Sequence, residues 1–165
     1  MNDEILDLVD DVAHRVQRAI TSRDCPAIVA VDGRRKLVLS DYDYLRDRAT
    51  AQAFERRAAE AAHTVHAVRW VFAVPMIWFE SSAGISARAV SNDPLNEGEQ
   101  ESILWIAFDQ ADGIDYGRVP YTRRPNGEPI FGDTEIVTLN VSLDDQAPGR
   151  TLLRHFLEGD DHPAA

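Results

Sequence analysis

Residues 68–80, with the sequence VRWVFAVPMIWFE, constrain the fold of this chain more than any other stretch. Their even positions, from Val68 to Trp78, are all apolar, which is the period of two that is typical of a β-strand. The odd positions are apolar too, apart from Arg69 and Pro75, and a strand with two apolar faces has to be covered on both sides. We therefore expect a central strand, with a bulge or a break at Pro75 because proline cannot donate to a sheet ladder.

Three segments have the character of helices. Residues 3–22 repeat apolar side chains at the spacing of an amphipathic helix. Ser40, with Asp43 three residues later as a variant of the capping box, is expected to open a second helix that continues through the alanine-rich residues 49–62. Residues 150–157 predict a short last helix.

The remaining strands are short and follow one another closely. An Asp-Gly pair between two apolar runs predicts a hairpin near the start of the chain. Few helices separate the strands, so we expect an antiparallel sheet and an α+β class: about five to six strands packed against two long helices and a short C-terminal helix. Besides the central strand, the predicted strand segments are 27–31, 37–39, 85–89, 103–108, 119–121 and 137–143.

The length of 165 residues predicts a single domain over residues 1–158, followed by a frayed tail over 159–165. A net charge of −11 argues against non-specific binding to nucleic acid, which needs a basic surface. No apolar stretch is long enough for a membrane span, so no membrane contact is expected. One cysteine, Cys25, and no opening signal segment predict a cytoplasmic protein without an internal disulfide. No glycine-rich phosphate loop is present, and no cofactor is expected.

The charge is unevenly distributed along the chain. No basic residue occurs between Arg88 and Arg118, whereas residues 34–57 are rich in arginine. Such segregation favours a basic protein partner, or a homodimer formed through opposite patches. Arginine and tyrosine are also frequent at protein interfaces. The predicted partner surface consists of Asp93, Glu97, Glu99, Glu101, Tyr116, Arg118, Tyr121, Arg123 and Arg124.

Three evenly spaced aspartates, Asp109, Asp112 and Asp115, are a weaker candidate for a metal site, because calcium and magnesium prefer carboxylate oxygens. The spacing is not that of an EF-hand, and a polar turn explains it equally well. With Arg118, these aspartates define an alternative function, a metal-assisted hydrolase or nucleotide-handling enzyme.

A third hypothesis is a small-molecule sensor whose cavity is lined by the aromatic residues Trp70, Phe72, Trp78 and Trp105. The same residues also suit a packed core. Because the sequence contains no catalytic motif, the leading prediction is a non-catalytic protein-binding domain of accessory, regulatory or immunity type, and whether the chain is an enzyme is left open.

Overall fold

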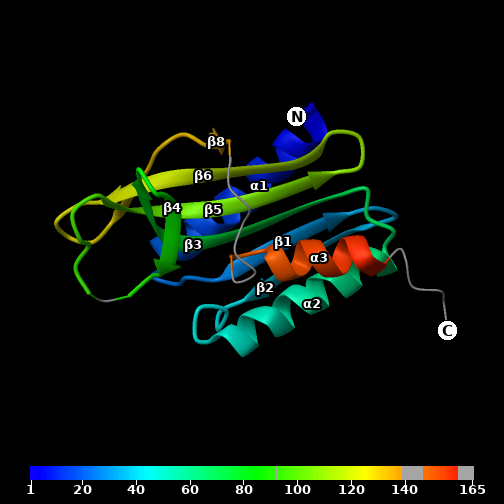
Figure 1. The fold of residues 1–165 in the computed structure, drawn as a ribbon, viewed down its shortest axis with the longest axis horizontal. Helices are drawn as coiled ribbons and strands as arrows, with labels where there is room; N and C mark the ends of the chain where they lie inside the picture. Colours follow the sequence, from blue (N-terminus) through cyan, green and yellow to red (C-terminus); the bar gives the residue numbers. More distant parts are fainter. Residues whose placement is uncertain (92, 139–146, 160–165) are drawn as a thin grey trace.

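The computed structural model describes residues 1–91, 93–138 and 147–159. An antiparallel sheet lies between helix α1 (Asp3–Thr21) on one face and helices α2 (Arg48–Thr64) and α3 (Arg150–Glu158) on the other (Figure 1). The main strand order is β2-β1-β3-β5-β6-β7, with β4 paired to β3 and β8 paired to β6. The strands are β1 (Ala27–Asp32), β2 (Lys36–Asp41), β3 (Arg69–Ser81), β4 (Gly84–Ala89), β5 (Glu99–Asp109), β6 (Gly113–Arg123), β7 (Pro129–Phe131) and β8 (Glu135–Val137).

The predicted α+β class with an antiparallel sheet is confirmed. The described residues contain eight strands rather than five or six. Strands β7 and β8 have three residues each, too few for an alternating pattern to show in the sequence, and β8 shares only Val137 with the strand predicted at 137–143. The predicted strand at 119–121 is part of the eleven-residue β6.

Strand β3 is continuous, so the bulge or break predicted at Pro75 is wrong. Its register with β5 runs without a slip from Arg69 to Phe79. On its other side β3 changes partner, because β1 pairs only as far as Ala73 and β4 begins at Met76. Pro75 lies in the gap between these two partners, where no neighbouring strand on that side needs a hydrogen bond from its backbone nitrogen.

Both faces of β3 are buried, as its sequence predicts. Trp70 and Phe72 belong to the core beneath α2 and α3, whereas Val71 and Ala73 belong to the core beneath α1. Helix α1 fills the second of these cores with an apolar stripe. Its start is capped by Asn2, whose side-chain oxygen accepts the amide of Ile5 at 2.9 Å.

The predicted start of the second helix at Ser40 is wrong. Ser40 lies in β2, where it pairs with Ile28, and α2 begins at Arg48. The N-cap is Asp47, whose carboxylate accepts the amide of Thr50 at 2.7 Å. Pairing with β1 therefore overrides the local capping signal and extends the hairpin to the end of β2.

Two predictions fall mainly on residues outside the described ranges. Of the strand predicted at 137–143, residues 139–143 lie outside them, and Val137 is the last residue of β8. Of the predicted tail at 159–165, residues 160–165 also lie outside them.

Helix α3 has no side-chain cap of its own, because its N-cap is Gly149. Glu55 of α2 supplies the missing acceptor: its carboxylate accepts the amide of Leu152 at 3.0 Å. The hydroxyl of Tyr44 donates to the other carboxylate oxygen at 2.8 Å. Glu55 is only 3% exposed, so these bonds compensate for its removal from water.

The other end of α3 is also held by α2. The imidazole Nε2 of His63 lies 2.9 Å from the carbonyl oxygen of Phe156, and the His63 ring stacks on the Phe156 ring with centroids 5.4 Å apart. Since Glu55 precedes His63 along α2, the two helices run side by side in the same direction (Figure 1). One helix thus provides an acceptor for the start of α3 and a donor for its end.

Replacing Glu55 with alanine is expected to lower the free energy of unfolding by about 2 to 3 kcal/mol, because the Leu152 amide and the Tyr44 hydroxyl lose their buried acceptor. Glu55→Gln retains an oxygen and an amide at the same place and should lose no more than about 1 kcal/mol. Urea unfolding measures both values. Glu60→Ala, on the exposed side of the same helix, is the matched control. A Glu55→Ala variant as stable as Glu60→Ala would refute this role.

The same carboxyl predicts a pH dependence. Burial raises the pKa of Glu55 above its ordinary value of 4.5, against the lowering effect of the Leu152 amide and the Tyr44 hydroxyl. A raised pKa means that Glu55 stabilises the fold most below 4.5 and that this contribution is lost as the pH rises through the higher value. The stability of the natural chain relative to Glu55→Gln should therefore fall as the pH rises above 4.5 in parallel urea titrations. A difference that is constant or rises would contradict the shift.

Candidate functional site

The sheet splits at the end of β6. Strands β5 and β6 pair from the Asp109–Gly113 position to the Ser102–Pro120 position and no further. Beyond Pro120, residues 121–123 of β6 pair with β7 on their outer side, while residues 99–101 of β5 remain paired with β3. The two strands therefore separate at this end of the sheet.

A groove of about 520 Å³ lies at this split. Ser91 and residues 93–95, which lead from β4 into β5, form one wall. Ile77 and Tyr121 are 2% and 1% exposed and form an apolar floor, whereas Leu95 on the wall is 44% exposed. The side-chain amide of Gln100 bridges the split by donating to the backbone carbonyl of Tyr121 at 2.5 Å.

Two arginine–glutamate pairs hold the charged groups of the groove in place. Arg88 of β4 donates twice to the carboxylate of Glu99, at 2.7 and 3.0 Å. Arg123 donates to the carboxylate of Glu101 at 2.9 Å. The side chains of Glu99 and Glu101 are 8% and 12% exposed, so these carboxylates are largely shielded from water by the pairing.

The resolved pKa shifts at the groove all move away from neutral pH. The Arg88 guanidinium, with the Asn96 amide, lowers the pKa of Glu99 to about 2. Burial raises the pKa of Tyr121, and burial also raises the pKa of the neighbouring Cys25 thiol despite the charge of Arg123. A general acid or base needs a pKa near the working pH, and none of these shifts brings its group closer to neutral pH.

The predicted partner surface is divided by the structure. Five of its residues line the groove: Asp93, Glu99, Glu101, Tyr121 and Arg123. Glu97 is exposed in the segment before β5, and Arg124 is exposed in the turn after β6; neither lines the groove.

Tyr116 and Arg118 lie on the opposite face of the sheet. Tyr116 packs against the core beneath α2 and α3. Arg118 lies over the ring of Trp78 at 4.9 Å and pairs with Glu135 at 2.9 Å. The difference follows from the period of two in β6, because even-numbered and odd-numbered residues face opposite sides of a strand.

Several residues that form the groove have no distinguishing signal in the sequence. Ile77 is one of many apolar residues in the central strand, and no local pattern marks Leu95. Arg88 reaches Glu99 because β4 folds back on β3, a register that a single sequence does not determine. The alternation of β6 was the one available signal, since it separates Tyr121 and Arg123 from Tyr116 and Arg118.

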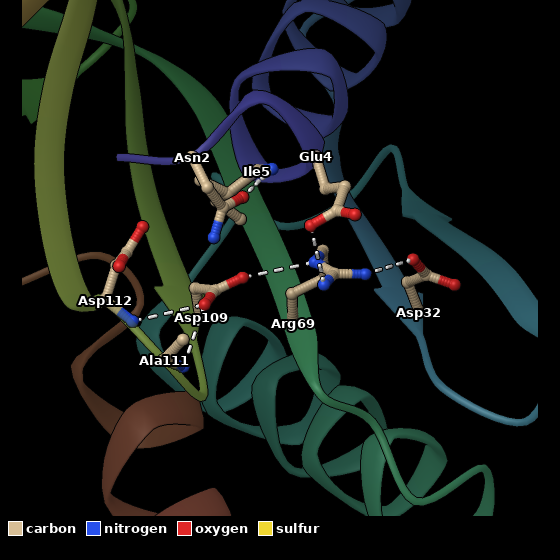
Figure 2. A network of polar contacts seen from close by, with 8 residues as sticks. All are labelled: Asn2, Glu4, Ile5, Asp32, Arg69, Asp109, Ala111 and Asp112. Atoms are coloured by element: carbon tan, nitrogen blue, oxygen red, sulfur yellow. Dashed lines mark hydrogen bonds and ion pairs between the residues drawn. The ribbon is translucent and has the colours of Figure 1, made fainter.

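The three aspartates of the metal hypothesis do not converge. Asp109 is buried at the end of β5, where it accepts from the Nε of Arg69 at 3.1 Å and from the amides of Ala111 and Asp112 at 2.8 and 3.1 Å (Figure 2). The side chain of Asp112 is exposed, and Asp115 is half-buried in β6, opposite Ala107. Across residues 1–91, 93–138 and 147–159, no group of three or more His, Cys, Asp or Glu side chains is placed to hold a metal ion.

Asp109 instead belongs to an ion network around Arg69. The Arg69 guanidinium also contacts Asp32 at 3.0 Å and Glu4 at 3.5 Å (Figure 2). Burial by itself would raise the pKa of Asp109, but hydrogen bonds from the Ala111 amide, the Asn2 side chain and Arg69 outweigh burial and hold it below its ordinary value. The network joins the last residues of β1 and β5 and the first residue of β3 to the start of α1. This role is structural.

The aromatic residues of the sensor hypothesis do not line one cavity. Trp70 and Phe72 fill the core beneath α2 and α3, and Trp105 fills the core beneath α1. Trp78 lies beneath Arg118 and donates its indole N–H to Glu80 at 2.8 Å. These side chains occupy opposite faces of the sheet, and all four are buried.

No protein-family model, no curated protein and no solved structure matches this chain. Among the helices of the described residues, none is both long and apolar enough to cross a membrane. The candidate site therefore depends on the geometry of the chain itself.

The Arg88–Glu99 pair makes a direct prediction. At pH 3 an ordinary glutamate is mostly protonated, whereas Glu99 should still be mostly ionised, because its pKa is about 2. In Arg88→Ala its pKa should rise towards 4.5, the ordinary value. Carbon-13 NMR titration of the side-chain carboxyl groups measures the change. Arg118→Ala, which removes an arginine from the other face of the sheet, should leave the pKa of Glu99 unchanged. A Glu99 that titrates near 4.5 in the natural chain would refute the pairing.

Proposed function

We propose that this chain is a cytosolic, non-catalytic protein-binding domain of accessory, regulatory or immunity type, and that the groove at the β5–β6 split is its contact surface. The groove itself is the observation that carries the proposal. It combines an apolar floor with charged groups held by hydrogen bonds, which is the usual composition of a binding site.

The groove is organised before a partner arrives. Arg88 and Arg123 are fixed by Glu99 and Glu101, and Gln100 is fixed across the split. Binding therefore does not require these long side chains to be ordered, a cost that otherwise reduces affinity. Tyrosine and arginine are also the residue types that most often dominate interface energetics.

The charge of the groove supports a partner with a basic side chain. Glu99 and Glu101 are each paired with an arginine, so they add little net charge. Asp93 on the wall and Glu97 beside it form no ion pair within the described residues. A lysine or arginine of the partner would pair with these two carboxylates while an apolar side chain covers Leu95.

Leu95→Asp should weaken binding, because it places a charge on the exposed apolar wall of the groove. Affinity capture with the purified chain from its native host, followed by mass spectrometry, identifies the partner. Its dissociation constant, measured by calorimetry, should rise by about tenfold or more in the variant. Asp93→Asn with Glu97→Gln should weaken binding less and reduce its dependence on salt.

Ile114→Asp is the matched control for the groove variant. Ile114 is 38% exposed, similar to Leu95, but lies near the other end of β6 on the opposite face. The Ile114→Asp variant should bind the partner with the same dissociation constant as the natural chain. Equal capture by the Leu95→Asp and natural chains, or capture of no protein by either, would contradict the proposal.

A further inference from the structure

Strand β2 is an open edge of the sheet. It pairs with β1 over all six residues, from Ala27–Asp41 to Asp32–Lys36, without a slip. Within the described residues no strand pairs with its other side (Figure 1). The strand contains no proline or bulge, two of the devices that commonly protect an edge from pairing with another chain.

The charged side chains of β2 are tied to its own helices. Lys36 donates to Asp11 of α1 at 2.6 Å, and Asp41 pairs with Arg57 of α2 at 3.4 Å. Lysine on an edge strand usually discourages strand pairing. Here that lysine is held against α1, which leaves the middle of the edge apolar, with Val38 38% exposed.

Neither helix layer closes this edge. No residue of β2 belongs to the core beneath α1, so Lys36, Val38 and Ser40 are exposed on that face. On the other face, Leu37 and Leu39 are only half-buried against the core beneath α2. A further strand beside β2 would cover both leucines more fully.

The sequence of the edge is complementary to itself. When a two-fold axis relates two antiparallel strands of one sheet, the axis lies midway between the two copies of one residue, because side chains that face each other must lie on the same face of the sheet. An axis at Val38 places Leu37 opposite Leu39 of the other copy, and Arg35 opposite Asp41. These contacts occur twice by symmetry, and Val38 faces Val38.

Neighbouring registers are less favourable. An axis at Leu37 would place Arg35 opposite Leu39, and an axis at Leu39 would place Leu37 opposite Asp41. Both registers place a charged side chain opposite an apolar one. The Val38 register instead places apolar side chains opposite apolar ones and a positive charge opposite a negative one. Arg35 is exposed and forms no ion pair with any described residue, so it is available to the second Asp41.

We propose that a second copy of this chain pairs with β2 in an antiparallel manner about a two-fold axis at Val38, so that one sheet continues through both copies. This self-association goes beyond the binding function proposed for the groove and does not depend on it. The groove involves β5 and β6, on the far side of the sheet from β2, so both grooves of the dimer remain accessible. A dimer would therefore present two binding sites to a partner.

Sedimentation velocity of the full chain, from micromolar to millimolar concentrations, tests the proposal first. The natural chain should form a species of twice 18.4 kDa as the concentration rises. Val38→Lys and Arg35→Asp should each raise the dissociation constant at least about tenfold, because each places like charges opposite each other. The triple variant R35D/D41R/R57D should regain the dimer, since the pair between copies and the Asp41–Arg57 pair within each copy are both restored in reverse. Arg124→Asp, with the same charge change at the other side of the sheet, should leave it intact.

A cross-link tests the register without relying on charge reversal. In a Cys25→Ser background, Val38→Cys should form a disulfide between copies under mild oxidation, because facing residues of antiparallel strands have Cα atoms about 4.5 to 5.5 Å apart. Ser40→Cys should not, since its counterpart would lie about 13 Å away along the strand. A monomer at every concentration, a dimer indifferent to Val38→Lys, or equal cross-linking at both positions would overturn the proposal.

Discussion

Because β3 carries apolar side chains on both faces, the sheet needs helices on each side, and this requirement places the other elements. The face with the small residues Val71 and Ala73 is covered by the single helix α1. The face with the large residues Trp70 and Phe72 is covered by α2 and α3 together. The asymmetry in side-chain size along one strand thus corresponds to the asymmetry of the two helix layers.

The two ends of β3 differ in how firmly the sheet is closed. At its start, Arg69 joins Asp32, Asp109 and Glu4, so that β1, β5 and α1 are tied together. Towards its end, β1 has already stopped and β6 has separated from β5, which leaves Ile77 as the floor of the groove. A closed end and a split end on one sheet give a rigid support with a surface left available for contact, the arrangement that binding sites generally need.

Much of the fold could be predicted from the sequence, because the relevant signals are local. The period of two in β3, the helical stripe of α1 and the apolar positions Leu152, Leu153 and Phe156 of α3 all point to the elements that form. The two wrong predictions have tertiary causes. Ser40 belongs to β2 because it pairs with β1, and Pro75 does not interrupt β3 because β3 changes partner there.

The site was only partly accessible to sequence reasoning for the same reason. Five residues of the predicted surface line the groove, but their arrangement depends on where β6 leaves β5 and on how β4 returns Arg88 to Glu99. Helix α3 shows a further consequence of such distant pairing: its Leu152 meets Glu55 across 97 positions of chain. During synthesis on the ribosome, Trp70 and Phe108 lack their contacts with Phe156 until this helix emerges, so a nascent chain halted before residue 150 leaves an aromatic part of the core exposed to aggregation.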